Sequence, residues 1–214
     1  MQNSYKNSAD NSAHYYSRNP SSESRRDVII YELNRSKLEF YTDSGVFSKR
    51  RVDFGTDLLI RSLPPLSGKI LDLGCGYGVA GISAALLNPG ADVWFIDVNE
   101  RAIGLCRENY ARLAAGLKTG TDNRFLCSDG FTEYGGSSFD AIMTNPPVRT
   151  GKTNVFRLYA EAYGRLRVGG AFFVVIQKKQ GMESTRAELL RLYGNCADIA
   201  RKSGYHVLQA TRVA

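Results

Sequence analysis

The sequence of 214 residues has no long apolar run, no pattern of a secretion signal and only four cysteines. No apolar stretch approaches the roughly 20 residues that a membrane-spanning helix needs. The amino-terminal region lacks a basic segment followed by an apolar one, so we expect an unsecreted, cytoplasmic protein. The cysteines form no C-x-x-C pair and have no histidine partner at zinc spacing, which predicts reduced, packed thiols and no metal site.

The composition is that of a globular protein, with 43% hydrophobic and 23% charged residues. Residues 1–26 are polar and rich in serine and asparagine, which predicts a flexible segment before a single domain over residues 27–214. The formal net charge of +7 favours a polyanionic partner such as nucleic acid, although many basic proteins bind none.

The order of the apolar runs predicts an α/β fold. Residues 27–43 are two β-type runs joined by "NRS", which indicates an amino-terminal hairpin, and a short helix capped by Thr56 is expected to follow. Beyond it, strands are expected at 69–74, 91–98, 123–129, 139–145 and 171–177, and helices at 77–90, 99–116, 153–170 and 183–195. Asn99 is expected to cap the second of these helices, and Gly169 and Gly170 to close the third. A terminal hairpin is expected at 197–212, with its turn at Ser203 and Gly204. This alternation predicts a mostly parallel seven-stranded sheet with helices on both faces and the antiparallel C-terminal hairpin at one edge.

The stretch "LDLGCGYGVAG" joins the first strand of this sheet to the next helix and carries Gly74, Gly76 and Gly78. In a doubly wound sheet this turn sits at the carboxyl end of the strand, where ligands bind, and glycine lets the backbone approach a ligand closely. A glycine-rich turn alone is weak evidence, since plain tight turns use it as well. Its G-x-G-x-G spacing, with Asp72 two residues before it, differs from the G-x-G-x-x-G of nicotinamide enzymes.

Acidic residues stand at the ends of three successive strands. Asp72 precedes the glycine turn, Asp97 ends the second strand, and Asp129 ends the third. A carboxylate at Asp97 can accept both hydroxyls of a ribose, and one at Asp129 can reach an adenine amino group. Each acid alone could be a helix cap or a solvated loop charge. Three of them beside a glycine turn are much harder to explain in that way.

The segments "LDLGCGYG", "IDVN", "SDG" and "NPP", in this order, resemble those of the class I S-adenosylmethionine-dependent methyltransferases. The segments "TDSGVFSK", "VDFGTDLLI" and "VVIQKKQG" resemble, more narrowly, the small-domain methyltransferases related to ribosomal RNA guanine-N2 methyltransferases. The resemblance extends from about Tyr15 to the carboxyl terminus. It implies a Rossmann-like class I methyltransferase fold and S-adenosyl-L-methionine as the cofactor.

The same resemblance implies roles for individual residues. The methionine portion of the cofactor would lie against the glycine turn, the ribose against the end of the second strand, and the adenine against the end of the third. The implied cofactor-binding residues are Asp72, Gly74, Cys75, Gly76, Gly78, Asp97, Val98, Asp129, Gly130, Phe131 and Asn145. The loop "GVFSKRRVDFG" would close over cofactor and substrate, and within it we single out Phe47, Asp53 and Thr56. The alternative for these three is a hydrophobic staple and caps of the next helix.

The turn "NPP", residues 145–147, follows the buried run "FDAIM" and is the candidate catalytic element. The lone pair of an exocyclic amine such as guanine N2 is delocalised into the ring, so the nitrogen is a poor nucleophile. The side-chain carbonyl of Asn145 and the backbone carbonyl of Pro146 could accept from its N–H groups and aim the lone pair at a methyl donor. Pro146 and Pro147 fix φ, so both oxygens are held in advance. The alternative for Asn145 is an ordinary turn residue before prolines.

The residue after the prolines departs from the pattern of many amino methyltransferases. They place tyrosine or phenylalanine there to stack a flipped base, whereas this chain has Val148. We therefore expect Phe47 or Tyr77 to supply the stacking surface, or a mainly aliphatic contact. The departure weakens adenine as the target and leaves guanine favoured by the family resemblance.

Basic residues are expected around the same end of the sheet: Lys49, Arg50, Arg51, Arg149, Lys152, Lys178 and Lys179. Such a rim can neutralise phosphates and position RNA without reading its sequence. The alternative is a scatter of solvated charges. The predicted substrate-binding residues are Phe47, Asp53, Arg149, Lys152, Lys178 and Lys179.

The family resemblance, supported by the basic charge and the Asn-Pro-Pro turn, implies N2-methylation of a guanine in ribosomal RNA of the 16S type. The expected partner is ribosomal RNA or a ribosomal subunit, with no membrane, and the expected state is a monomer or weak homodimer. One alternative is a protein glutamine-amide N-methyltransferase, against which the basic charge argues. The other is a non-catalytic RNA-binding module, which would not require Asn145 beside an intact glycine turn.

Overall fold

The computed structural model describes residues 18, 22–115, 125–136 and 138–213. Most of the segment 1–26, predicted to be flexible, lies outside these described residues. The strands are β1 (Asp27–Leu33), β2 (Ser36–Thr42), β3 (Lys69–Leu73), β4 (Asp92–Asp97), β5 (Phe125–Cys127), β6 (Phe139–Thr144), β7 (Leu166–Gln177), β8 (Ala197–Lys202) and β9 (Tyr205–Thr211). The helices are α1 (Phe54–Ser62), α2 (Val79–Leu87), α3 (Glu100–Leu113), α4 (Lys152–Arg165) and α5 (Met182–Tyr193), with 3-10 turns η3 (Val148–Thr150) and η4 (Lys178–Gln180).

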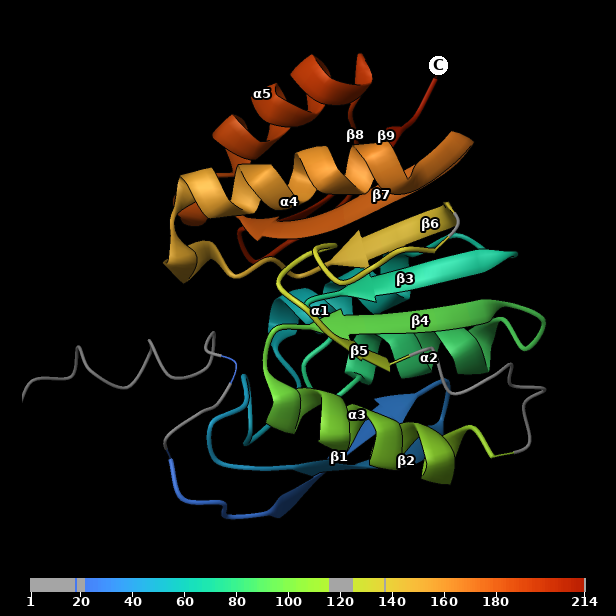
Figure 1. Cartoon of the computed structure of the whole chain (residues 1–214), viewed down its shortest axis with the longest axis vertical. Helices are drawn as coiled ribbons and strands as arrows, with labels where there is room; N and C mark the ends of the chain where they lie inside the picture. The colour runs from blue at the N-terminus through green and yellow to red at the C-terminus, as the bar shows by residue number, and fades with distance from the viewer. Residues whose placement is uncertain (1–17, 19–21, 116–124, 137, 214) are drawn as a thin grey trace, which may run out of the picture.

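Seven strands form one sheet in the order β5-β4-β3-β6-β7-β9-β8. The first five pair in parallel and β9 and β8 pair antiparallel, which confirms the predicted fold class. The strands β3, β4 and β6 direct their carboxyl ends to one edge, on the left in Figure 1. The chain runs outward from β3 to β4 and then returns to β6 on the other side. The turn after β3 therefore lies at the switch point, where doubly wound sheets bind ligands.

Alternate residues of the strands build two hydrophobic cores, one on each face of the sheet. In β7, Phe173 and Val175 belong to the core that includes α1, α2 and α3, whereas Phe172 and Val174 belong to the core with α4 and α5. Helices thus cover both faces, and Figure 1 shows α1 and α2 behind the strands. None of the described helices is both long and apolar enough to cross a bilayer.

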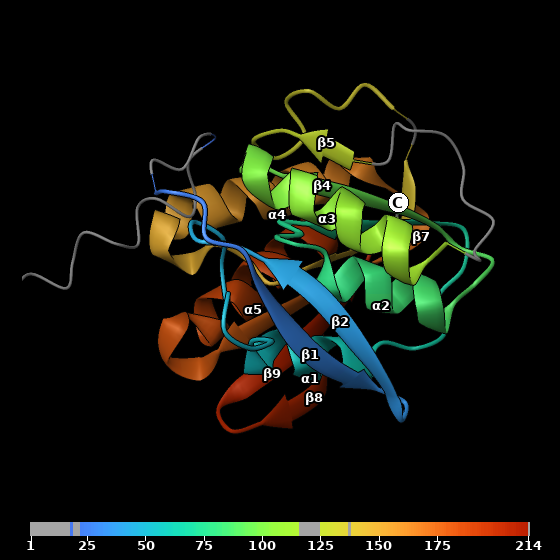
Figure 2. The same ribbon diagram turned by 90° about the horizontal axis from the view of Figure 1, so that it is seen from below.

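Strands β1 and β2 form a separate hairpin outside the main sheet, shown in blue in Figure 2. Their two-residue turn has φ of 47° at Asn34 and 69° at Arg35, as a type I′ turn requires. The buried side chain of Asn109 in α3 accepts from the Tyr41 amide at 2.7 Å and donates to the Tyr41 and Tyr77 carbonyls at 2.9 Å each. The hairpin is thereby tied to α3 and to the glycine turn, and it leads into the loop that reaches the site.

The start of α1 differs from the prediction. The helix begins at Phe54, and its cap is Asp53 rather than Thr56. The Asp53 Oδ2 atom accepts from the backbone amides of Gly55 and Thr56 at 2.9 and 3.3 Å. Aspartate and threonine can both cap a helix, so residue type alone does not tell which of the two caps α1. The position of Asp53 in the folded protein does.

The boundary between α4 and β7 was also predicted wrongly. Gly169 and Gly170 were expected to close the helix, but α4 ends at Arg165 and β7 begins at Leu166. Leu166 is fully buried and extended, so it already belongs to the sheet core. The two glycines lie in the strand where its register with β6 shifts, and Gly169 has a φ of 82°. Glycine inside a strand commonly marks such an irregularity.

Candidate active site

The loops at the carboxyl edge of the parallel strands enclose a cavity of about 440 Å³. This volume lies within the range of small-molecule sites. All three predicted catalytic residues line it, as does every predicted cofactor-binding residue except Gly78 and Phe131. Of the predicted substrate-binding residues, Phe47, Asp53 and Arg149 line it, whereas Lys152, Lys178 and Lys179 do not.

The glycine turn after β3 leaves bare backbone beside the cavity. Gly74 and Gly76 have φ of 74° and 55°, and nothing lies within 4 Å of the position that a Cβ would take on either. A side chain there would occupy space that a ligand can use instead. Gly78 serves packing, because its Cβ would lie only 2.6 Å from the Cys106 sulfur and 2.8 Å from Ile82 Cδ1.

The carboxylate of Asp97 holds the glycine turn in place. Its Oδ2 accepts from the Gly76 amide at 2.8 Å and its Oδ1 accepts from the Asn99 amide at 2.8 Å. Burial raises the pKa of Asp97, and the backbone hydrogen bonds oppose that rise. Each carboxylate oxygen can accept a further hydrogen bond. Because Asp97 also lines the cavity, it can accept from ligand hydroxyl groups such as those of a ribose.

Asp72 is only 2% exposed and forms part of the cavity wall beneath the glycine turn. Its Oδ2 accepts from the Gly81 amide in the first turn of α2 at 2.7 Å. Burial, with a smaller contribution from the nearby Asp97 carboxylate, raises the pKa of Asp72 to about 7. A positively charged ligand group in the cavity would therefore favour the ionised form of Asp72. With the bare glycines and Asp97, it provides groups that fit a nucleoside bearing an amino acid.

Asp72 should make the free energy of unfolding depend on pH. The folded-state pKa, about 7, lies above the unfolded value, so the folded protein binds more protons between about pH 4 and 7. Stability contributed by the protonated carboxyl is then lost as the pH rises through 7. We therefore expect the free energy of unfolding of Asp72→Asn, relative to that of wild type, to rise by about 2–4 kcal/mol as the pH increases from 5 to 8. Urea unfolding without ligand at a series of pH values measures this difference. A constant difference between the two proteins across this range would contradict the assignment.

At the end of β5 the structure separates the three predicted residues. Gly130 lines the cavity, but Phe131 is buried and packs edge-on against Tyr134. Asp129 is exposed at the cavity wall and forms an ion pair with Arg157 at 2.6 Å. Phe131 therefore supports this wall from behind, and the pair with Arg157, which the sequence did not indicate, sets the direction of the Asp129 carboxylate.

The turn after β6 places Asn145 at the cavity with its amide nitrogen already bonded. Its Nδ2 donates to Asp53 Oδ2 and to Thr56 Oγ1, each at 3.0 Å. The Pro146 carbonyl accepts from the Val148 amide at 2.8 Å, and Pro147 has φ −75° and ψ 67°, the geometry of an inverse γ-turn. A carbonyl oxygen has two lone pairs, so Pro146 can accept one more hydrogen bond. Both residues that carry the predicted pair of oxygens thus line the cavity.

The predicted basic rim is largely exposed to solvent. Arg50, Arg51, Arg149, Lys152, Lys178 and Lys179 are exposed and Lys49 is half-buried. None of the seven forms an ion pair with an acidic residue in the part of the chain that the structure describes. Lys152 lies 5.0 Å from the centre of the Phe156 ring. Most of these positive charges are therefore available to an external anion.

The aromatic side chains at the cavity differ in their access to a ligand. Phe47 is 45% exposed and lines the cavity, whereas Tyr77 is 4% exposed and its hydroxyl donates to the Ser48 carbonyl at 3.2 Å. Tyr205, at the start of β9, also lines the cavity and packs on Phe54 with ring centres 5.4 Å apart. Sequence reasoning missed Tyr205, because its strand reaches the site only through its pairing with β7. Within the described residues, no cluster of three potential metal ligands is present.

The chain is similar in sequence to a known protein family and to several of its members. The methyltransferase small domain family matches residues 37–209. The chain is 38% identical to YbxB of Bacillus subtilis over 94% of its own length and the full length of that protein. It is 34% identical to ribosomal RNA large subunit methyltransferase G of Streptomyces griseus and 35% identical to ribosomal RNA small subunit methyltransferase C of Shewanella loihica, each over 79% of this chain.

Those two relatives are longer proteins. The chain covers 44% of the Streptomyces enzyme and 48% of the Shewanella enzyme, about half of each. A solved 16S rRNA N2 methyltransferase of T. thermophilus, in complex with AdoMet and guanosine, has a TM-score of 0.74 and 25% identity. That match covers 87% of this chain and 50% of the T. thermophilus chain. The expected family is confirmed: the chain belongs to the methyltransferase small domain family.

Proposed function

We propose that the protein is an S-adenosylmethionine-dependent methyltransferase that modifies the exocyclic N2 amine of a guanine in ribosomal RNA. One observation carries the proposal: the Asn145 amide, oriented by Asp53, lies at the same cavity as the glycine turn and Asp97. A methyl-accepting amine and a nucleoside-type cofactor can therefore occupy one enclosed space. The guanine assignment is supported by the T. thermophilus relative, whose structure holds guanosine.

The residues at the cavity have distinct tasks in such a reaction. The bound cofactor would supply an activated methyl group on a sulfonium. Asp97 and the backbone of Gly74 and Gly76 would hold its nucleoside portion, and Asp72 would face its ammonium group. The side-chain oxygen of Asn145 and the carbonyl of Pro146 would accept from the amine N–H groups. This draws the nitrogen lone pair out of conjugation and aims it, so that positioning lowers the barrier.

The assignment can be tested with isotopically labelled S-adenosylmethionine. The purified protein is incubated with small ribosomal subunits, large ribosomal subunits, deproteinised ribosomal RNA or a release-factor protein, and modified products are identified by mass spectrometry. We expect N2-methylguanosine in one of the RNA-containing samples. Methylated glutamine would instead support the protein-directed alternative, and label in none of the four samples would contradict the proposal.

The basic rim should control RNA affinity rather than the chemical step. Neutralising Lys152, Lys178 and Lys179, the predicted substrate-binding residues outside the cavity, together to glutamine is expected to weaken RNA binding roughly tenfold to a hundredfold near 0.1 M salt. Each phosphate contact contributes about 0.7–0.9 to the slope of log affinity against log salt, so the slope should fall by about two. Filter binding across a salt series measures both quantities, and kcat should change by less than about twofold.

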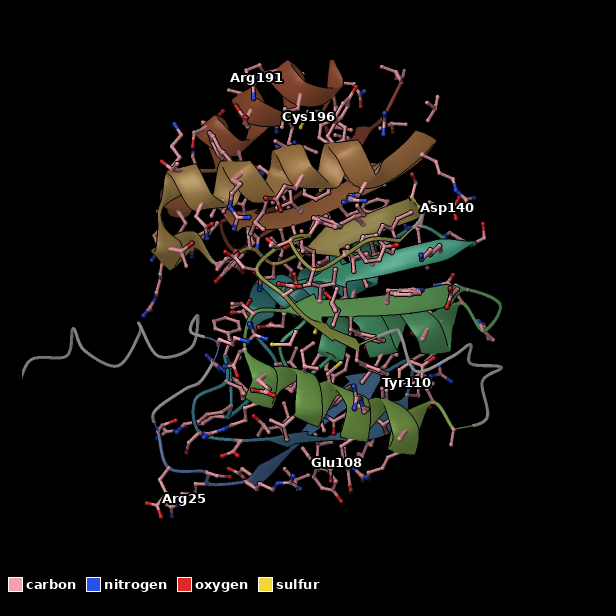
Figure 3. All side chains as sticks on the ribbon, viewed as in Figure 1. Arg25, Glu108, Tyr110, Asp140, Arg191 and Cys196 are labelled. Carbon is pink, nitrogen blue, oxygen red and sulfur yellow. The ribbon has the colours of Figure 1, made fainter. Side chains whose placement is uncertain are left out.

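A matched triple variant controls for the change in net charge. Lys37 and Arg167 are exposed away from the cavity, and Figure 3 shows Arg191 on the outer side of α5. Changing these three residues to glutamine removes the same formal charge. An equal loss of affinity in both triple variants would mean that the rim makes no specific contact and that only net charge matters.

We place the reaction in the cytoplasm, where ribosomes are available.

A further inference from the structure

We propose that Asp53 is a positioning residue that fixes which way the Asn145 amide faces. The inference deepens the proposed function and rests on it. Asn145 Nδ2 lies 3.0 Å from Asp53 Oδ2 and 3.0 Å from Thr56 Oγ1. Both partners belong to the start of α1, 89 and 92 residues earlier in the chain. The catalytic amide is therefore oriented by an element outside the strands that carry the glycine turn and the Asn-Pro-Pro turn.

The carboxylate decides the orientation of the amide. A threonine hydroxyl can donate or accept, so Thr56 could bond to either the NH₂ group or the oxygen of the Asn145 amide. An ionised carboxylate only accepts, so the Asn145 atom beside Asp53 must be the NH₂ group. The amide oxygen is then directed away from Asp53, and no described residue donates a hydrogen bond to it. It remains available as an acceptor at the cavity.

Asp53 is itself held at a defined point. Its Oδ2 accepts from the second and third backbone amides of α1, and the helix amino terminus favours a negative charge there. Gly55 allows this close arrangement, because a Cβ on it would lie 2.9 Å from Asp53 Oδ2 and 3.0 Å from Tyr205 Cε1. The buried residues Leu59 and Ile60 anchor α1 in the core. The helix thus positions the carboxylate, and the carboxylate positions the amide.

Loss of this anchor should impair transfer without impairing cofactor binding. An amide without the carboxylate can rotate and present its NH₂ group to the substrate N–H, which places two donors against each other. The negative charge also polarises the amide and makes its oxygen a better acceptor. Neither effect involves the glycine turn or Asp97.

Three variants separate this role from helix capping. Serine caps a helix well but is too short to reach Asn145, whereas asparagine can keep both the cap and an acceptor. We expect Asp53→Ser to lower kcat about a hundredfold and Asp53→Asn less than tenfold, with cofactor Kd unchanged within about threefold in both. The control is Asp57→Ser, in the same helix, because Asp57 bonds to Arg61 and Tyr31 instead. It should keep the wild-type kcat.

Two kinetic outcomes would overturn the inference. A kcat of Asp53→Ser within threefold of wild type would mean that the amide needs no anchor. Equal impairment of Asp53→Asn and Asp53→Ser would mean that the charge acts on the substrate directly.

A second readout is independent of activity. In a ¹⁵N-labelled protein, the Asn145 side-chain NH₂ signals, identified by their loss in Asn145→Asp, should exchange with water at least tenfold more slowly than those of an exposed asparagine. The protection should disappear in Asp53→Ser. Unprotected wild-type signals would overturn the role of Asp53 even if the enzyme were active. A protein without activity on any RNA, but with protected signals, would instead contradict the proposed function alone.

Discussion

Replacing Asn145 by alanine is expected to lower kcat about a thousandfold while cofactor affinity changes less than threefold. The variant removes the side-chain oxygen that is proposed to accept from the substrate amine, and preorganised hydrogen-bonding groups of this kind contribute about 10²–10³ in rate. The cofactor contacts proposed for Asp97 and the glycine turn are untouched. Single-turnover kinetics with saturating RNA measure the chemical step, and calorimetry measures the cofactor Kd.

The matched control for this variant is Asn88→Ala. Asn88 lies at the carboxyl end of α2, and its Oδ1 accepts from the Leu66 amide at 2.8 Å, so its loss should lower stability by about 1 kcal/mol but leave kcat unchanged. A tenfold or smaller loss of kcat in Asn145→Ala would show that the side chain is a turn residue. A loss of cofactor affinity in proportion to kcat would show that it serves the cofactor site.

The local sequence pattern predicted those parts of the fold in which the secondary structure and burial of a residue follow from the residues next to it in the sequence. The apolar runs that became β3, β4 and β6, and the asparagine cap of α3 at Asn99, required no knowledge of distant contacts. The terminal hairpin turns at Ser203 and Gly204 as predicted, with φ of 51° and 78°. Because the ends of parallel strands meet at one edge, the same pattern also predicted that the glycine turn and Asn145 lie together.

The features that the sequence did not predict depend on contacts between distant segments. The glycine pair 169–170 looks like a helix stop, but the burial of Leu166 and the pairing with β6 make it part of a strand. The ion pair of Asp129 and Arg157 joins residues 28 positions apart, and neither has a local signature. Phe131 follows a strand end closely enough to suggest a ligand contact, yet it is held in the aromatic cluster on the face of the sheet that α4 and α5 cover.

The choice of caps at α1 has a functional side as well. Asp53 and Thr56 were both singled out, with helix capping as the alternative to substrate binding. The structure shows that Asp53 does cap the helix and that the same oxygen contacts Asn145, the proposed catalytic residue. Capping therefore does not exclude a role of Asp53 at the site. The sequence pattern did not indicate that one oxygen makes both sets of contacts, because Asp53 and Asn145 are 92 residues apart.

Replacing Asp97 by alanine should weaken cofactor binding about a hundredfold or more. Two hydrogen bonds from ribose hydroxyls to a carboxylate contribute roughly 1.5–3 kcal/mol each, and every 1.4 kcal/mol changes Kd tenfold. Burial disfavours the charged form of Asp97, so the variant should fold although the Gly76 and Asn99 amides lose their side-chain acceptor. The control is Asp140→Ala, at the opposite, amino end of β6 in Figure 3, where Asp140 pairs with Arg167. Calorimetric titration with S-adenosylhomocysteine measures Kd for each protein.

A cofactor analogue tells whether Asp97 acts on the ribose or only on the Gly76 amide. Wild-type protein should bind the 2′,3′-dideoxy form of S-adenosylhomocysteine about as weakly as Asp97→Ala binds the natural compound. Asp97→Ala should bind the two ligands with nearly equal affinity, because it lacks the carboxylate that would accept from the ribose hydroxyls. Such non-additivity is the signature of direct contact. If the loss of binding free energy from the substitution and the loss from the missing hydroxyls simply add, Asp97 does not contact the ribose. Its effect on affinity would then come from holding the glycine turn in shape.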